Sequence, residues 1–280
     1  MSALEPMLRE TAGRRPQSAD DDEAARGFAW SRVIGLPVIA GTMDAVTDGI
    51  LARAGAAEGG YVCVANVHML VTARRDPRFR PVVEQAPLVV SDSRPLVWEL
   101  HRQGLTFAEQ LYGPLLMVEL CRKAAAEGTP VFFYGGDDQV RDALVSELAR
   151  RFPALRIAGA EAAPLLPAEP PLDPALVGRI RASGARLVFA ALGCPKQEFW
   201  MRRHAPELGA VLLGVGQAFN VVAGTLPDAP DWMRARGLGW LYRLAREPRR
   251  LWRRYVVTNS LFLGYLARER LSARFHRAAG

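Results

Sequence analysis

Short apolar runs alternate with amphipathic stretches along the chain, and two of these runs are Leu187–Leu192 and Ala210–Val215. Each is bounded by glycine and is short enough to be a buried strand of a parallel sheet. Further strands are expected at Val33–Val38, Tyr61–Ala65, Leu88–Val90, Val131–Tyr134 and Leu155–Ala158. Because helical patterns separate these runs, the sequence predicts an α/β fold with a mostly parallel, Rossmann-like sheet and helices on both faces.

Glycine-rich loops follow the two central runs. Gly193-Cys194-Pro195-Lys196-Gln197-Glu198 comes after the first, and Gly214-Val215-Gly216-Gln217 ends the second. Ligands of open α/β sheets bind outside the carboxyl ends of the strands, where glycine-rich turns present backbone N–H groups to phosphate. The two loops therefore indicate a nucleotide or diphosphate site.

Lys196 is one of two lysines among 36 Lys and Arg residues, the other being Lys123. Its position in a Gly-x-Pro turn suits a contact with a diphosphate. The alternative is that Lys196, Gln197 and Glu198 are an ordinary solvated first turn of a helix.

Polar residues also follow the other predicted strands. Asp92 comes after Leu88–Val90, where it could act as a general base or cap the helix expected near Pro95. Asn66 and His68 follow Tyr61–Ala65 and could bond sugar hydroxyls, although a lone histidine is more often structural. Asp137 and Asp138 follow Gly135-Gly136; they favour a helix N-terminus over a metal site.

Composition limits the class of protein. Half of the 280 residues are hydrophobic, which is enough for a large core, and the mean hydropathy is near zero. Three widely spaced cysteines form neither a disulfide framework nor a metal-ligand cluster, so a reducing cytoplasm fits best. Residues 1–29 lack the apolar segment of a signal peptide and are expected to be a disordered lead-in to an α/β domain at 30–228.

Positive charge is concentrated at the C-terminus. Residues 230–280 contain 12 arginines and three acidic residues, a surplus of nine that exceeds the net +7 of the whole chain. Such a segment suits an anionic partner, either phospholipid or nucleic acid. Trp240, Leu241, Leu251, Trp252 and Tyr255 are interleaved with the arginines, which favours lipid, so residues 229–280 are expected to be a membrane-associating appendage.

A series of motifs extends from about Val33 to Phe262. Two are unusual strings, G-x-P-K-Q-E at 193–198 and E-P-R-R-L-W-R-R-Y at 247–255. The others are Asn66–Met69, Asp92–Trp98, Tyr112–Pro114, Gly135–Gly136, Gly214–Gly216, Ala223–Gly224 and Ala229–Pro230. With these motifs in this order, the chain resembles the WecG/TagA/CpsF glycosyltransferases, glycosyltransferase family 26.

The resemblance implies a hexosyltransferase that moves a sugar, commonly N-acetylmannosamine or its uronic acid, from a UDP donor to a polyprenyl-diphosphate-linked sugar. It implies inversion, no metal and no other cofactor, and a role in cell-surface polysaccharides such as teichoic acid or exopolysaccharide. The expected partners are the two substrates and an anionic membrane surface on the inner face of the cytoplasmic membrane, with no nucleic acid. A homo-oligomer is compatible with the sequence.

The same resemblance implies roles for individual residues. Asp92 is expected to be catalytic, together with Asn66, Arg249 and Arg253. The residues expected to bind substrate are His68, Tyr112, Gly136, Gly193, Lys196, Gln197, Glu198, Gly214, Gly216 and Gln217.

Five positions depart from the family pattern. Val64, Ser93, Gln110, Leu115 and Asn220 stand where the family often has threonine, glycine, arginine, aspartate and aspartate. These departures support a second hypothesis, a non-catalytic nucleotide-sugar-binding or scaffold protein, whereas the presence of Asp92 argues for catalysis. A nucleic-acid-binding protein is a third hypothesis, but the chain has no recognised motif for it.

Overall fold

The computed structural model describes residues 27–278, without the side chains of residues 250, 254 and 273–278; the predicted lead-in lies almost entirely outside this range. Within it, the strands form one sheet in the order β1-β2-β4-β3-β8-β7-β5-β6. All neighbours are parallel except β1 and β2. The strands are β1 (Phe28–Val33), β2 (Leu36–Gly41), β3 (Gly60–Ala65), β4 (Leu88–Ser91), β5 (Val131–Gly135), β6 (Ile157–Glu161), β7 (Leu187–Ala191) and β8 (Val211–Gly214).

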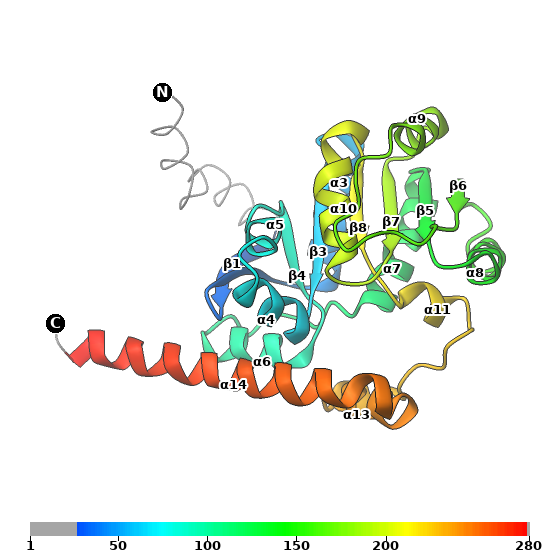
Figure 1. Cartoon of the computed structure of the whole chain (residues 1–280). Coiled ribbons are helices and arrows are strands. Elements are labelled where there is room, and N and C mark those ends of the chain that lie inside the picture. Colours follow the sequence, from blue (N-terminus) through cyan, green and yellow to red (C-terminus); the bar gives the residue numbers. More distant parts are fainter. Residues whose placement is uncertain (1–26, 279–280) are drawn as a thin grey trace.

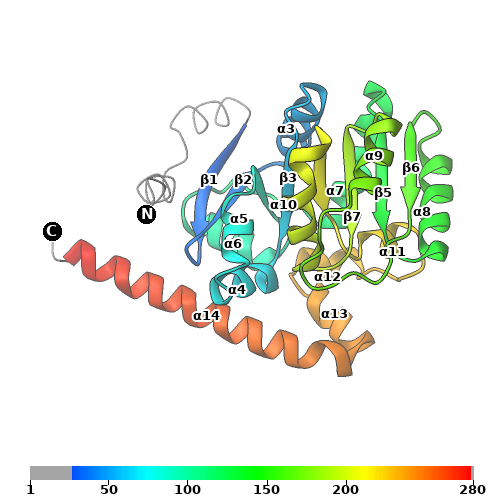
Figure 2. The ribbon, with the colours of Figure 1, turned by 45° about the horizontal axis from the view of Figure 1, so that its top comes forward.

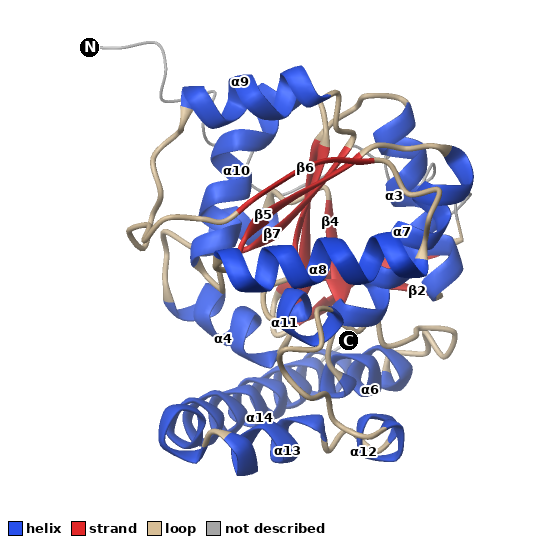
Figure 3. Ribbon diagram, turned by 90° about the vertical axis from the view of Figure 1, so that its right-hand side faces the viewer, coloured by secondary structure: helices blue, strands red, loops and turns tan. Residues whose placement is uncertain are grey.

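Helices cover both faces of the sheet (Figure 3), which confirms the predicted fold class. One face carries α4 (Val67–Arg75), α5 (Arg80–Glu84), α6 (Arg94–Arg102), α9 (Pro174–Ser183) and α10 (Lys196–Leu208). The other carries α3 (Met43–Gly55), α7 (Gly113–Glu127), α8 (Asp138–Arg151) and α11 (Ala218–Val222). Large aromatic side chains fill both layers: Trp200 stacks on Tyr134 at 5.0 Å, and Phe133 stacks on Phe189 at 5.4 Å.

The strand predicted at Val33–Val38 is wrong. The chain instead makes a hairpin in which Val33 pairs with Leu36, and Ile34 and Gly35 form the turn with positive φ values of 47° and 76°. A β-branched residue rarely adopts positive φ, and Ile34 is fully buried, so the apolar pattern gave no sign of a turn.

Three helices leave the sheet at the C-terminus: α12 (Asp231–Ala235), α13 (Gly239–Arg246) and α14 (Pro248–Ala278). Figures 1 and 2 show α14 crossing below α4 and α6, near the carboxyl ends of the strands. Phe262 and Leu266 of α14 are buried in the core layer of that face. No helix of the described residues is both long enough and apolar enough to span a bilayer.

Ion pairs fix the distal half of α14 to the sheet domain. Arg270 donates to the buried Glu99 of α6 at 2.9 Å, and Arg74 of α4 pairs with Glu269 at 3.4 Å. Arg74 also lies over the ring of Tyr265, 4.6 Å from its centroid. The described part of α14 is therefore held by polar contacts as well as by buried apolar side chains.

Candidate active site

Asn66 and Asp92 lie side by side because they follow neighbouring parallel strands. Ala65 of β3 is in register with Ser91 of β4, so the next residue of each strand emerges at the same edge of the sheet. The backbone N–H of Asp92 continues the ladder by donating to the carbonyl of Ala65 at 2.8 Å. The amide of Asn66 donates to Oδ2 of Asp92 at 3.5 Å, while its own Oδ1 caps α4 by accepting from Met69 N–H.

The other carboxylate oxygen of Asp92 accepts from the backbone N–H of Gly113, the first residue of α7, at 2.9 Å. The capping role considered for Asp92 is therefore not observed, since its side chain is bound to α7 and α6 begins after Ser93 without a side-chain cap. Burial raises the pKa of Asp92 to about 6, although the bonds from Gly113 and Asn66 and the charge of Arg243 lower it. A carboxylate with a pKa near neutrality suits a general base.

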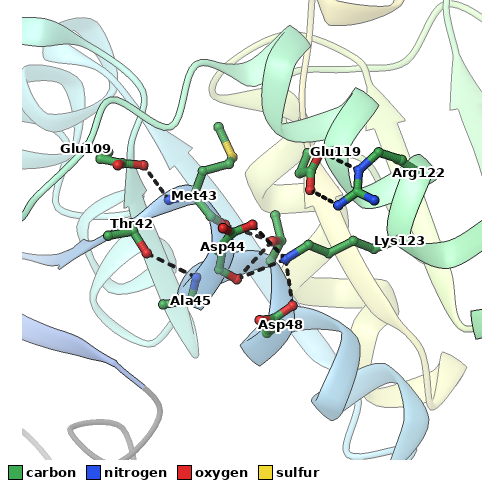
Figure 4. A network of polar contacts seen from close by, with 10 residues as sticks. Thr42, Met43, Asp44, Ala45, Asp48, Glu109, Glu119, Arg122 and Lys123 are labelled. Atoms are coloured by element: carbon green, nitrogen blue, oxygen red, sulfur yellow. Dashed lines mark hydrogen bonds and ion pairs between the residues drawn. The ribbon is translucent and has the colours of Figure 1, made fainter. Parts of the chain in front are cut away.

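The segment before α7 is anchored so that it presents polar groups to Asp92. Glu109 accepts from the N–H of Met43 at 2.7 Å, as Figure 4 shows, and its own N–H donates to the carbonyl of Gly41 at 3.0 Å. The next residue, Gln110, donates from its side chain to the carbonyl of Asp92 at 2.8 Å. Glu109 therefore fixes the connector that carries Gln110 and Tyr112.

Lys123 ties α7 to α3 in the same network. Its amine lies 2.6 Å from Oδ1 of Asp48 and 3.2 Å from Oδ1 of Asp44 (Figure 4). Because α7 begins with the N–H that holds Asp92, this ion-pair cluster supports the site from the far end of the helix.

A cavity of about 440 Å³ opens above Asp92, between the sheet edge and the C-terminal helices. Four of the predicted site residues line it: Asn66, His68, Asp92 and Tyr112. Its opposite wall is largely apolar and is supplied by Trp98 of α6 and by residues of α13 and α14, which include Trp240, Arg243, Tyr255, Phe262 and Leu263. An apolar pocket with a few convergent polar groups is typical of a ligand site.

Tyr112 is held by a residue that the sequence did not single out. Its hydroxyl donates to Oδ1 of Asp228 at 2.6 Å, and the guanidinium of Arg234 lies 5.3 Å from the centroid of its ring. Arg234 in turn pairs with Oδ2 of Asp228 at 2.7 Å. Burial and the neighbouring Asp228 raise the pKa of Tyr112 far above its ordinary value, so the hydroxyl stays a donor.

The glycine-rich turns form a second group, around the end of β7. Gly136 N–H donates to the carbonyl of Ala191 at 3.3 Å, and Val215 N–H donates to the carbonyl of Ala190 at 2.9 Å. A Cβ atom on Gly135 would lie 2.6 Å from the oxygen of Ala191, so the backbones approach too closely for any side chain. The turns after β5, β7 and β8 are thus bonded to one another, as expected because β7 lies between β8 and β5 in the sheet.

Gln197 and Glu198 lie inside this second group, with only 4% and 0% of their surface exposed. Gln197 accepts from the N–H of Gly193 at 3.2 Å and donates to Glu198 at 2.8 Å, and a Cβ on Gly216 would lie 3.5 Å from its Oε1. Burial raises the pKa of Glu198 to about 7. The alternative of a solvated first helical turn is wrong for these two residues, whose side chains shape the turns from within.

Lys196 has a partner within the chain. Its amine donates to the carbonyl of Leu166 at 2.7 Å and so pins the proline-rich loop between β6 and α9 beside the turn after β7. The amine of Lys196 therefore orders this loop, and a direct contact with a diphosphate stays a prediction.

The two groups of residues meet at Gly113. A Cβ on Gly113 would lie 3.7 Å from Oδ1 of Asp92 and 3.8 Å from the carbonyl oxygen of Val215. Gln217, at the start of α11, follows the same turn, and its buried Oε1 has no hydrogen-bond partner. The carboxylate and the glycine-rich turns are consequently adjacent parts of one edge of the sheet.

Arg249 and Arg253 are exposed on the first turns of α14 and do not line the cavity. The arginine that acts on Asp92 is Arg243 of α13, which the sequence analysis counted only as part of an amphipathic pattern. Asp228 was also missed, although it directly precedes the Ala229-Pro230 motif. A pattern of alternating arginines shows which helix is basic, but not which guanidinium faces the sheet.

The carboxylates after β5 serve the helix that follows. Asp137 caps α8 by accepting from Val140 N–H at 2.8 Å, and Asp138 pairs with Arg141, which confirms the helix-terminus interpretation. Among the described residues, no group of three or more His, Cys, Asp or Glu side chains could hold a metal ion. Independence from metal stays a prediction.

A Rossmann-like sheet with a half-buried carboxylate beside glycine-rich turns is typical of enzymes that transfer a group from a nucleotide-activated substrate. Residues 31–276 match the model of the glycosyl transferase WecG/TagA/CpsF family, and the chain belongs to this family. It is 30% identical over 222 residues to the N-acetylglucosaminyldiphosphoundecaprenol N-acetyl-beta-D-mannosaminyltransferase of Bacillus spizizenii (strain ATCC 23059 / NRRL B-14472 / W23). The match covers 78% of this chain and 83% of that relative. The predicted family and the assignment as a hexosyltransferase are confirmed.

Proposed function

We propose that the protein transfers N-acetylmannosamine, or a closely related hexose derivative, from UDP to a polyprenyl-diphosphate-linked N-acetylglucosamine. The observation that carries the proposal is Asp92, a half-buried carboxylate with a pKa of about 6 at the base of a cavity walled by amphipathic helices. The name of the Bacillus relative supports the choice of sugar and acceptor.

In this reaction Oδ2 of Asp92 takes the proton of the acceptor hydroxyl. The hydroxyl oxygen attacks the anomeric carbon on the face opposite the diphosphate, the glycosidic bond forms with inversion, and UDP leaves with the bonding electrons. Asn66 orients the carboxylate, since its amide donates to the same Oδ2. The turns at Gly136, Gly193 and Gly214–Gln217 would border the leaving diphosphate, but the N–H groups of Gly136, Gly193 and Gly216 already donate within the chain, so charge stabilisation would come mainly from other donors.

The arginines of the C-terminal helices would add positive charge to the same step. Arg243 already faces the cavity, whereas Arg249 and Arg253 are exposed at the start of α14 and would reach the diphosphate only after a rearrangement of these helices. His68 lines the cavity, and we propose that it contacts the sugar.

The proposed acceptor sits in a membrane, and the C-terminal helices carry a surface suited to one. Trp252, Val256 and Leu263 of α14 are 54%, 58% and 65% exposed and share the helix with arginines. Such a helix binds an anionic bilayer in the plane of its surface. We therefore place the protein on the inner face of the cytoplasmic membrane, where UDP-sugars and the lipid acceptor meet.

The activity is tested with purified protein, a panel of UDP-sugars and a detergent-dispersed polyprenyl-diphosphate-N-acetylglucosamine, with UDP release as the readout. UDP release that depends on the acceptor and is fastest with UDP-N-acetylmannosamine is expected. Binding of UDP-sugar without turnover of any member of the panel would instead support the non-catalytic alternative.

The membrane surface is tested by sedimentation with vesicles of anionic phospholipid. Trp252→Glu with Val256→Glu should prevent sedimentation and leave turnover of the dispersed acceptor largely intact, because neither side chain lines the cavity. Leu165→Glu is the matched control, because Leu165 is 99% exposed and lies in the loop after β6. Sedimentation of the double variant at the parental level would contradict the assignment of this face.

A further inference from the structure

Asp228 lies at the junction between the sheet domain and the C-terminal helices, and both of its carboxylate oxygens are engaged. Oδ1 accepts from the hydroxyl of Tyr112 at 2.6 Å and from the N–H of Ala229 at 2.7 Å. Oδ2 accepts from Nη1 of Arg234, on α12, at 2.7 Å. One side chain thus joins the segment before α7 to the first helix of the appendage.

The residue that Asp228 holds is adjacent to the group that holds Asp92. Tyr112 immediately precedes Gly113, whose N–H donates to Oδ1 of Asp92 at 2.9 Å. The peptide bond between Tyr112 and Gly113 is planar, so a change in the backbone of Tyr112 tilts that N–H away from Asp92. The ring of Tyr112 is also covered by the guanidinium of Arg234.

We propose that Asp228 is a positioning residue: through Tyr112 and Gly113 it fixes the orientation of the Asp92 carboxylate, and through Arg234 it makes that orientation depend on the seating of α12. The inference rests on the proposed role of Asp92 as general base. It assigns the tyrosine hydroxyl to an internal contact instead of to the substrate, and it connects the appendage to the base by side chains that do not touch the reacting atoms.

The two arms of Asp228 can be separated by substitution. Asp228→Ala removes both arms. Tyr112→Phe removes only the hydrogen bond between Tyr112 and Asp228, which is the arm that leads to Asp92. Asp228→Asn keeps an oxygen that accepts from Tyr112 but replaces the oxygen that pairs with Arg234. Asp231→Asn is the matched control, because Asp231 also contacts Arg234 but its side chain is 91% exposed and has no bond to Tyr112.

All variants are measured as full-length protein on the dispersed acceptor, with kcat and KM determined separately. Asp228→Ala and Tyr112→Phe should each lower kcat by roughly tenfold to a hundredfold, the range for a displaced catalytic group, with KM for the UDP-sugar changed less than about threefold. The kcat of the double variant should be no lower than that of the less active single variant, since both substitutions act on one chain of contacts. Asp228→Asn keeps the contact with Tyr112 and loses the ion pair with Arg234, so its kcat should lie between those of Asp228→Ala and the parent; Asp231→Asn should match the parent.

The inference is overturned if Tyr112→Phe and Asp228→Ala keep the parental kcat, or if their losses multiply in the double variant. A folding defect is recognised by thermal unfolding of each variant, and Tyr112→Phe, which removes a single oxygen, keeps the test valid if Asp228→Ala does not fold. Asp92→Asn is assayed in parallel. Parental turnover in Asp92→Asn removes the proposed function, whereas an inactive Asp92→Asn with a fully active Asp228→Ala removes only the positioning role.

Discussion

Replacement of Asp92 by asparagine is expected to lower turnover sharply and at the same time stabilise the fold. The pKa of about 6, against an ordinary value of 3.8, means that ionisation of this carboxyl is disfavoured in the folded protein. The difference corresponds to about 3 kcal/mol as an upper limit. Because Asp92 borders an open cavity and is only half-buried, a gain of about 1–3 kcal/mol in the free energy of unfolding is expected at pH 7.5.

The sign of the effect depends on pH. In the folded protein Asp92 keeps its proton up to about pH 6, whereas in the unfolded chain it loses the proton near its ordinary pKa. Rising pH between these values therefore destabilises the parent and leaves the asparagine variant unaffected. The advantage of the variant should be present at pH 7.5 and should shrink as the pH falls toward about 4.

The assay is urea unfolding of parent and variant at both pH values, combined with UDP release. Turnover should fall by about a hundredfold or more, the usual contribution of a general base. Asp142→Asn serves as control, since that side chain lies on α8 and is 71% exposed. An asparagine variant that is equally destabilised at both pH values, or that turns over at the parental rate, would refute the reasoning.

Three further outcomes are expected. Lys196→Ala should weaken UDP affinity, measured by calorimetry, by about 1.5–3 kcal/mol, because its amine orders the loop at Leu166; equal affinity would exclude the loop from the site. Turnover should survive EDTA, and loss of activity that Mg²⁺ restores would return Asp138 to consideration. Arg270→Gln should increase hydrogen exchange in the distal half of α14, whereas the exposed Arg268→Gln should not. The reason is that Arg270 holds a charged partner: burial alone would raise the pKa of Glu99, but its hydrogen bonds, including the one from Arg270, hold that pKa at about 2.

The sequence predicted the sheet and its polar edge because those features follow from local pattern. Short apolar runs such as Leu187–Leu192 are typical of buried parallel strands, and the residue after each strand must emerge at the carboxyl edge of the sheet. Asn66 and Asp92 could thus be placed together before their contacts were known. The hairpin at Ile34 was missed because its turn residue is itself buried, so hydrophobicity and turn chemistry conflict there.

The remaining differences arise from contacts between distant segments. Whether Gln197 faces a ligand or the interior depends on how closely it approaches the turns around it: a Cβ on Gly214 would lie 2.8 Å from its side-chain nitrogen, and no local pattern records that approach. The partners of Tyr112 are Asp228 and Arg234, and Arg243 acts on Asp92; all three are more than 100 residues away in the sequence from the residue on which they act. Arg243 could therefore be distinguished from Arg249 and Arg253 only when the direction of each helix was known.

The arginines of α13 and α14 have a consequence for how the protein would respond to its surroundings. Guanidinium groups keep their charge throughout the pH range in which proteins work, whereas Asp92 exchanges its proton near pH 6. Adhesion to an anionic membrane would therefore be insensitive to acidity and would weaken mainly with rising ionic strength. On the proposed membrane surface, a pH below about 6 would protonate Asp92 and slow the proposed transfer without releasing the arginine-rich helices from the lipid.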